Sequence, residues 1–357
     1  MDNNTICDWT KATDYDVFIG MDVDKRSIAL TTRDRMGLGK SLKMSYDPEM
    51  LLSYVHNHFE GKNPAFVYEA GPTGFGLHDA IREKGYPCIV VAPQTIPITR
   101  GKRVKTNRLD SVKLADLLRG GQLSGIRVPP SAYRELRELT GLRNAQIDAV
   151  RASKCRVKSL LLNNSLAFSD AQGRWSKRAI CNLRELNCNR AVRFKLSTLL
   201  DDIEWHQKQA LRTQVALRQL IDSEPEFAES MGFLMSIPGV GWIIASYTLA
   251  RVGDWRLLGR SDEMSSFMGL VPCEDSTGDD TNRGSITKAG DQRLRSLIIQ
   301  GAWTAIRNDH ELGDFYERVR KNHPSHTAAR IGIVAVARKM AIRMHCVLRE
   351  RRNYEKR

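Results

Sequence analysis

Residues 17–23 read Val-Phe-Ile-Gly-Met-Asp-Val, a short run of mostly apolar side chains that carries the carboxylate of Asp22 at its end. Two more β-rich runs follow, at residues 27–32 and 40–46, and a Gly-Leu-Gly turn separates them. Short runs of this kind between turns predict strands. We therefore expect a three-strand meander that begins with residues 17–23.

Helices and strands alternate after the meander. Strands are predicted at residues 64–70 and 88–92, and helix-period stretches precede them at residues 48–59 and 74–84. A further helix is predicted at residues 108–120, where a Gly pair closes it. This alternation predicts an α/β domain whose helices cover the faces of one sheet.

Long, charged helices replace this pattern after Pro129-Pro130. Across residues 192–220, apolar residues recur at alternating steps of four and three, with His206 and Thr213 on the same seam. This 3.5-residue repeat is typical of a coiled coil, in which a polar seam residue more often sets the register than binds a ligand. We expect a spacer that also dimerises the chain.

A more compact helical unit is predicted beyond this spacer. Residues 237–241 read Ile-Pro-Gly-Val-Gly between two apolar helical stretches. The turn resembles a helix-hairpin-helix motif, in which the amides of Gly239 and Gly241 would hold a DNA phosphate; a plain connecting turn fits the same residues equally well. The basic tail at residues 349–357 is expected to be a frayed, solvated end. The chain thus divides into a predicted α/β domain (1–125), a coiled-coil region (126–230) and an all-α C-terminal region (231–357).

The charge balance points to a polyanionic partner. The 357 residues include 55 Lys and Arg against 41 Asp and Glu, a net charge of +14 at pH 7. Nucleic acid fits this excess best, and an anionic membrane surface is second. No run approaches the roughly 18 to 20 apolar residues that span a bilayer, and residues 1–4 lack the charge pattern of a signal peptide. We expect a cytoplasmic protein, nucleoid-associated when it acts, with no membrane partner.

Carboxylates lie at the ends of two predicted strands. Asp22 ends the first strand, and Glu69 ends a later one. The helix that follows supplies Asp110, with Asn107 three residues earlier on the same helical face. Oxygen ligands gathered around one point suit Mg²⁺ or Mn²⁺, ions that stabilise the attacking and leaving oxygens in phosphodiester cleavage. The order of these acids resembles the ribonuclease-H-like fold of Holliday-junction resolvases.

A basic segment leads directly into the acidic helix. Its members are Arg100, Lys102, Arg103, Lys105 and Arg108. A solvated charged loop is the ordinary interpretation of such a run, but beside a carboxylate cluster it would bring a phosphate backbone to the metal. We predict that these five side chains bind nucleic acid.

Seven short motifs occur in order along the chain. They are Gly20–Val23, Tyr68–Gly74, Val104–Asp110, Leu114–Arg119, Ile237–Gly241, Phe267–Pro272 and Ile286–Gly290. Together they resemble the DEDD-motif transposases of the IS-110 type of insertion sequence, and the likeness covers about residues 17–345. The ordered set is far more specific than any single motif.

The resemblance implies a RuvC-like catalytic domain, a coiled coil and a C-terminal transposase domain. It also implies partners that composition does not reveal, namely donor and target DNA and a structured, non-coding bridge RNA that pairs with both. Family members act as homodimers that assemble into tetramers, in which the acidic site of one subunit meets the C-terminal serine of another.

That serine corresponds to Ser276, in a polar stretch at residues 273–283 that we expect to be a loop. A flexible loop can present a hydroxyl to a phosphorus atom, and basic residues downstream would stabilise the phosphate charge. These residues are Arg283, Lys288, Arg293 and Arg295. Ser285 is the rival nucleophile.

One position departs from the family. Asn107 stands where the family usually has Asp, so one of the four acids is an amide here. Asn offers a carbonyl oxygen to a metal, but it contributes no charge and does not serve as a base. Asp116 is a poor substitute, because six residues along a helix turn it away from the face of Asp110.

These features predict a DNA recombinase in which Asp22, Glu69 and Asp110, with Asn107, hold Mg²⁺ near the scissile phosphate while Ser276 attacks it. One alternative is a resolvase-like nuclease or DNA invertase that uses metal-activated water. The other is a degenerate, non-catalytic RNA- and DNA-binding protein, with Asn107 as the mark of lost chemistry.

Overall fold

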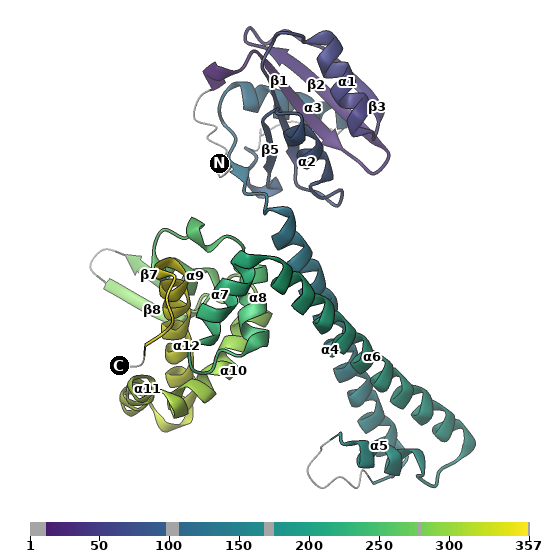
Figure 1. Cartoon of the computed structure of the whole chain (residues 1–357), viewed down its shortest axis with the longest axis vertical. Helices are drawn as coiled ribbons and strands as arrows, with labels where there is room; N and C mark the ends of the chain where they lie inside the picture. The colour runs from purple at the N-terminus through teal and green to yellow at the C-terminus, as the bar shows by residue number, and fades with distance from the viewer. Residues whose placement is uncertain (1–11, 98–106, 168–174, 278–279, 356–357) are drawn as a thin grey trace. The chain divides into compact units, whose positions relative to one another are not determined.

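The computed structural model describes residues 12–97, 107–167, 175–277 and 280–355. Two compact units form, residues 1–128 and 129–357 (Figure 1). The first contains a mixed sheet with helices, and the second is mainly helical. A mixed α/β sheet followed by a helical region confirms the predicted fold class at that level.

The sheet of the first unit has six strands in the order β3-β2-β1-β4-β5-β6. Their bounds are β1 (Val17–Val23), β2 (Ser27–Asp34), β3 (Ser41–Ser45), β4 (Pro64–Glu69), β5 (Cys88–Val91) and β6 (Gly125–Ile126). β1 runs antiparallel to β2 and parallel to β4. The predicted meander therefore leads into a parallel centre, and the unpredicted β6 adds an antiparallel edge strand beside β5.

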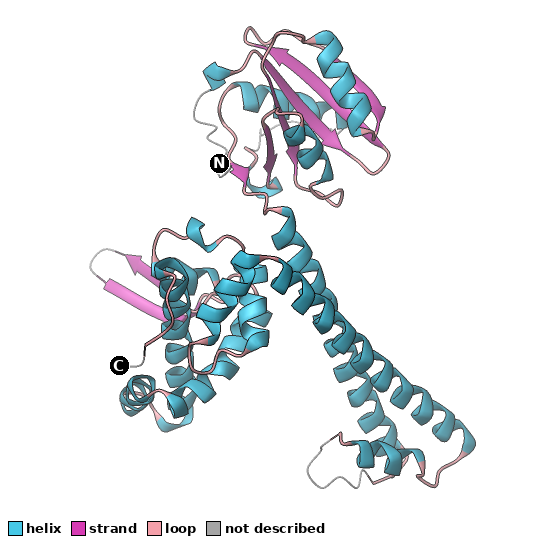
Figure 2. Cartoon of the chain, in the orientation of Figure 1, coloured by secondary structure: helices cyan, strands magenta, loops and turns pink. Residues whose placement is uncertain are grey.

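Helices cover both faces of this sheet (Figure 2). They are α1 (Pro48–His58), α2 (Gly76–Glu83) and α3 (Asn107–Arg119), with short 3-10 turns at η1 (Ala12–Asp14) and η2 (Pro93–Thr95). Successive side chains of a strand point to opposite faces. Phe18 of β1 accordingly shares a core with Leu118 of α3, whereas Ile19 shares a second core with Leu51 of α1 and Ile81 of α2.

Two long helices, α4 (Ser131–Asn163) and α6 (Arg190–Ser223), pack along each other in the second unit. The short α5 (Lys177–Arg184) packs against α6. Seam residues such as Ile203 and Leu217 are buried, and Nδ1 of His206 lies 2.6 Å from Oε1 of Gln146 on α4. His206 therefore contacts the facing helix.

Beyond α6, the described part of this unit contains six further helices and a 3-10 turn, besides a β-hairpin. They are α7 (Pro225–Met235), α8 (Trp242–Val252), η3 (Trp255–Leu257), α9 (Ser261–Phe267), α10 (Gln292–Asn308), α11 (His310–Lys321) and α12 (Ser325–Glu350). Asp291 and Asp309 begin α10 and α11, because each carboxylate accepts a first-turn backbone N–H. Leu136 of α4 belongs to their common core, so the hairpin formed by α4 and α6 packs into this core at one end. None of the helices in the described ranges is long and apolar enough to cross a membrane.

The polar stretch at residues 273–283 was expected to be a loop, but its described residues belong to a β-hairpin. β7 (Pro272–Thr277) pairs with β8 (Asp280–Ile286) in antiparallel register. The backbone hydrogen bonds of each polar strand are made by the other strand. The expectation was wrong because strand propensity depends instead on apolar and β-branched side chains that pack on a half-buried surface.

Candidate active site

Asp22 and Glu69 follow each other across two neighbouring strands. The parallel register of β1 and β4 ends at the pair Met21 and Tyr68, and the two acids are the next residue on each strand. Both are partly exposed, in contrast to the buried residues before them. The carboxyl ends of parallel strands meet at one sheet edge, so both acids lie at that edge.

The third acid, Asp110, approaches the same edge from α3. Phe18 shares a core with Leu118 near the end of α3, whereas Gly20 lies against Ser111 near its start. Residues of β1 that are closer to Asp22 therefore contact residues of α3 that are closer to its first turn. Asp110 lies in that turn and is partly exposed.

Gly20 makes this approach of α3 possible. A Cβ at Gly20 would lie 2.3 Å from both the carbonyl oxygen of Ser111 and the amide nitrogen of Ala115. Thr31 of β2, the strand partner of Gly20, also holds α3 in place. Its Oγ1 lies 2.9 Å from Oγ of Ser111 in a buried contact. The position of Asp110 thus depends on one glycine and one hydroxyl pair.

The carboxylates at this edge do not form a compact metal-binding cluster in the described structure. Among the residues that the structure describes, no three His, Cys, Asp or Glu side chains are gathered closely enough to hold a metal ion. Asn107 is the first residue of α3, and its side chain lies outside the described part. The candidate donors are therefore two acids at the ends of β1 and β4, one acid in the first turn of α3 and the amide residue at the start of that helix.

Asp116 has a structural partner. Its Oδ1 accepts a hydrogen bond of 3.0 Å from Nε of Arg33 on β2, and the Arg33 side chain is 17% exposed. This ion pair ties the middle of α3 to the sheet. The expectation that Asp116 does not replace the missing fourth acid agrees with this position.

Most of the predicted basic segment lies outside the described residues, namely Arg100, Lys102, Arg103 and Lys105. Its last member, Arg108, is the second residue of α3 and has an exposed side chain. One cation of the segment therefore stands beside the carboxylate edge.

The glycine turn at residues 237–241 joins α7 to α8. Gly239 has a φ of 85°, and a Cβ there would lie 2.3 Å from the carbonyl oxygen of Gly301 on α10. Gly241 precedes α8 without a side-chain cap, and a Cβ there would meet nothing within 4 Å. Gly239 thus serves close packing, while the amides that follow Gly241 open α8. An open hollow of about 580 Å³ lies over the turn, lined also by Thr304 and Asn308.

Ser276 lies in β7, opposite Thr281 of β8, and its side chain and that of Arg283 lie outside the described part. Ser285, the rival, is exposed in β8. Lys288 follows the hairpin with an exposed side chain and a φ of 55°, and its amide donates to the carbonyl of Gly269.

Two of the predicted phosphate ligands have other partners. Arg295 is buried and donates hydrogen bonds to the carbonyl oxygens of Met268 (3.1 Å) and Ala289 (2.9 Å). Its assignment to nucleic acid is therefore corrected, because this guanidinium joins the segments before and after the hairpin. Arg293 forms an ion pair of 2.9 Å with Asp148 on α4.

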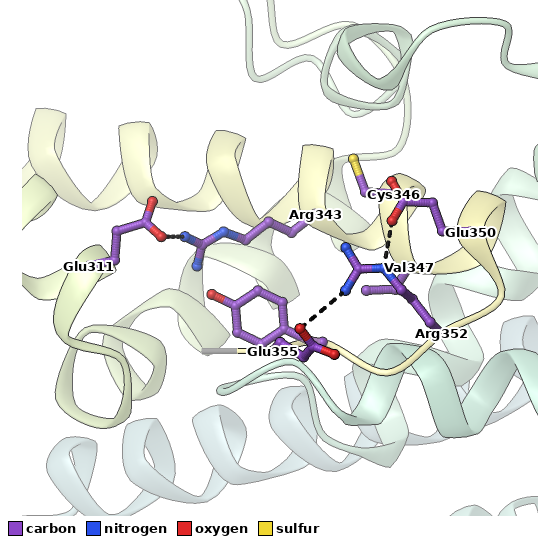
Figure 3. A pocket seen from close by; sticks show the side chains of 8 residues that line it. Glu311, Arg343, Cys346, Val347, Glu350, Arg352 and Glu355 are labelled. Atoms are coloured by element: carbon purple, nitrogen blue, oxygen red, sulfur yellow. Dashed lines mark hydrogen bonds and ion pairs between the residues drawn. The ribbon is translucent and has the colours of Figure 1, made fainter. Parts of the chain in front are cut away.

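The C-terminal tail is docked rather than frayed, up to the last described residue. Tyr354 donates from its hydroxyl to Oδ2 of Asp309 (2.7 Å) and from its amide to Oγ of Ser236 (2.7 Å), next to the glycine turn. Asp309 also pairs with Arg343, which forms a second ion pair of 2.8 Å with Glu311. Both Arg343 and Glu311 line a cavity of about 330 Å³ (Figure 3). These partners are distant in sequence, and no local pattern indicated them.

The electrostatics of this cluster favour an ionised Asp309. Burial alone raises the pKa of Asp309, but hydrogen bonds from Tyr354 and the Leu312 amide, with the charge of Arg343, leave the pKa below its ordinary value. Burial, and then the bond to Asp309, raise the pKa of the Tyr354 hydroxyl. The tyrosine therefore remains a hydrogen-bond donor at neutral pH.

Comparison with known proteins relates both units to mobile elements. Residues 231–317 match the family model described as "Transposase IS116/IS110/IS902 family", and residues 19–164 match a DEDD-type IS110 model described as "Transposase". These two matches include the sheet edge, the start of the long hairpin, the glycine turn and the β7–β8 hairpin.

Relatives that match most of the chain agree. The chain is 31% identical over 308 residues to "Putative transposase y4qE" of Sinorhizobium fredii, which covers 82% of this chain and 72% of the relative. It is 24% identical over 344 residues to "Transposase for insertion sequence element IS1533" of Leptospira borgpetersenii, covering 92% and 94%. The chain therefore belongs to the IS110 family of insertion-sequence transposases, enzymes that carry out DNA strand transfer.

Proposed function

We propose that this transposase cuts and rejoins donor and target DNA through a covalent serine–DNA intermediate at Ser276, assisted by a divalent metal at the carboxylate edge. The observation that carries the proposal is that Asp22 and Glu69 follow each other at the ends of the neighbouring parallel strands β1 and β4, while Asp110 lies in the first turn of the helix packed on β1. Three hard oxygen donors at one edge suit Mg²⁺, with Mn²⁺ as a substitute.

The residues that would hold the metal are Asp22, Glu69 and Asp110, with the side-chain carbonyl of Asn107 as a neutral fourth donor. A divalent ion held there would supply charge stabilisation to the phosphate oxygens. Arg108, exposed in the same helical turn as Asp110, would hold the DNA backbone at this edge. We expect Arg100, Lys102, Arg103 and Lys105 to extend that contact.

The proposed chemical step belongs to Ser276. Its Oγ forms a bond to phosphorus as the bond from phosphorus to a deoxyribose oxygen breaks; the serine proton leaves to solvent, and the departing oxygen takes up a proton. Attack by a deoxyribose hydroxyl of the exchanged strand then reverses the step and restores the serine. Support comes from the β-hairpin, which holds residue 276 on a strand, and from exposed Lys288 at its base.

The first unit is proposed to have a ribonuclease-H-like, RuvC-like fold. Support comes from its strand order, in which an antiparallel β1–β2–β3 meander continues into parallel β4 and β5. We propose that the amides near Gly239 and Gly241 hold a phosphate, because the open hollow lies directly over this turn.

A bridge RNA that pairs with donor and target DNA is proposed as a further partner, together with a homodimer that assembles into a tetramer. Self-association is supported by large apolar side chains on α6 that the hairpin leaves exposed. Trp205, Leu211 and Val215 are 54%, 65% and 56% exposed. A coiled coil between subunits would cover such side chains.

The decisive experiment is strand transfer between donor and target DNA with the RNA from the element's flanking region and Mg²⁺. We compare the wild type with Ser276→Ala, Ser285→Ala and Asn107→Asp, and trap protein–DNA adducts by denaturation. Loss of product and adduct in Ser276→Ala alone is the expected result.

Other outcomes contradict specific parts of the proposal. Product without any adduct would assign the attack to water, as in a resolvase-like nuclease or invertase. An adduct that only Ser285→Ala abolishes would move the nucleophile to Ser285. Product only in Asn107→Asp would identify the natural chain as a degenerate nucleic-acid-binding protein.

A further inference from the structure

The end of the α4–α6 hairpin farthest from the C-terminal core carries most of the net positive charge of the protein. Residues 149–200 contain eleven Lys and Arg and two Asp and Glu, a net charge of +9, whereas the whole chain has +14. About one seventh of the sequence thus carries nearly two thirds of the net charge. We call the described residues of this stretch, 149–167 and 175–200, the basic end.

The basic end is a folded platform with its own core. Val157 of α4, Ile180 and Leu183 of α5, and Leu196 of α6 are buried together, in a cluster separate from the core of the C-terminal helices. Lys154 lies 5.3 Å from the ring centroid of Trp175. The short α5 therefore closes the core at this end of the hairpin.

The charges of the basic end are exposed and poorly neutralised. Within the described residues only two of its cations form ion pairs: Arg184 with Asp201 and Glu204, and Arg151 with Asp148 at 4.0 Å. Exposed cations without a described carboxylate partner are Arg156, Lys158, Lys177, Arg178, Arg190, Arg193 and Lys195. Burial and then the charge of Lys158 lower the pKa of Lys154, which is consistent with uncompensated positive charge.

We infer that the basic end binds the phosphate backbone of duplex DNA, at a surface separate from both the carboxylate edge and the glycine turn. The family acts on DNA, and the excess of exposed cations is complementary to its phosphates. Arg151 to Lys158 spans about 10 Å of α4 at 1.5 Å per residue, the length of about three phosphates along one strand. Flexible cations without a pocket give backbone contacts that do not depend on base sequence.

Binding of full-length protein to a labelled 40-base-pair duplex, measured by fluorescence anisotropy from 50 to 250 mM KCl without divalent metal, tests this inference. The variant Arg156→Gln/Lys158→Gln/Arg178→Gln removes three exposed cations. If each contacts a phosphate, the slope of log affinity against log salt falls by about 0.9 per contact, and affinity at 100 mM KCl falls at least tenfold.

A matched control removes the same charge elsewhere. Lys62, Arg82 and Lys84 are exposed in the first unit and form no ion pair with a described carboxylate. Lys62→Gln/Arg82→Gln/Lys84→Gln should keep the wild-type slope. Equal losses in both triple variants would reduce the effect to net charge and overturn the inference, as would an unchanged slope in the basic-end variant.

Two further arms identify the ligand and guard against misfolding. Arg156→Lys/Arg178→Lys keeps both charges and should restore wild-type affinity; failure to do so would contradict a charge-based contact. The same titration with an RNA duplex of equal length distinguishes the polymers, and a loss confined to RNA would refute DNA as the ligand. Because the readout is binding without metal, it remains informative even if Ser276 is not the nucleophile.

Discussion

Gly20 determines how close α3 lies to the sheet. Its missing side chain lets the backbone of Ser111 and Ala115 reach β1, and the buried Thr31–Ser111 hydroxyl contact then holds the helix in place. Asp110 directly precedes Ser111, so the separation between Asp110 and the strand-end acids depends on this contact. A residue without functional groups thus sets the geometry of a proposed metal site.

Gly20→Ala should impair both stability and strand transfer. The new Cβ would lie 2.3 Å from two backbone atoms, and overpacking of this kind costs about 1–3 kcal/mol. Urea unfolding measures the loss, and strand transfer is assayed where the variant is still folded. Gly141→Ala in α4 is the control: its Cβ would meet nothing within 4 Å, and alanine should stabilise the helix by about 0.5–1 kcal/mol. Wild-type stability in Gly20→Ala would show that α3 shifts without cost.

At the scale of elements, the C-terminal segment after α12 closes over the start of α11. Tyr354 bridges Asp309, which caps α11, and Ser236, which ends α7. Arg343 of α12 completes the charge balance of the buried Asp309. One cluster therefore joins three helices and the tail.

This cluster should make stability sensitive to acid. The pKa of Asp309 is depressed when folded, so its contribution is fully present above the ordinary carboxyl pKa of 3.8 and is lost as pH falls through the lower folded value. Urea unfolding at pH 7, 5 and 2.5 should show a smaller acid-dependent loss in Asp309→Asn than in the wild type. Tyr354→Phe should lower stability at pH 7 by about 1.5–3 kcal/mol, the range for hydrogen bonds to charged groups. Equal acid dependence in wild type and Asp309→Asn would exclude this carboxylate as the cause.

The elements that sequence predicted well share one property: their pattern is local. β1, β4 and α3 were placed to within two residues because apolar periodicity and flanking turns mark them, and the positions of Asp22, Glu69 and Asp110 followed. The β7–β8 hairpin and the docked tail were missed because their partners are other polar residues. Arg295 was wrongly predicted to bind nucleic acid. Its burial under the base of the β7–β8 hairpin depends on tertiary contacts, which the local sequence does not reveal.

At the scale of the whole molecule, self-association should depend on Leu211 and Val215, exposed apolar residues that lie four apart on one side of α6. Leu211→Glu/Val215→Glu places two charges where we propose a second subunit, and charges buried without partners weaken an interface strongly. Sedimentation velocity should show at least a tenfold rise in the dimer dissociation constant. Leu162→Glu, at an 80% exposed position near the end of α4, is the control and should leave the dimer intact. A monomeric wild type, or an unaffected Leu211/Val215 variant, would locate the interface elsewhere.

The continuous helix α4 fixes the distance between the two cores that it joins. Leu136 belongs to the core of the C-terminal helices and Leu160 to the core of the basic end, and one continuous helix joins them. Twenty-four residues at 1.5 Å each separate the two by about 36 Å, close to one turn of B-form DNA. A DNA duplex lying along α4 would therefore present the same side of the duplex to both ends of the protein helix. Adding or removing a heptad in α4 and α6 would change that spacing by about 10 Å and bring the two contacts out of phase with the double helix.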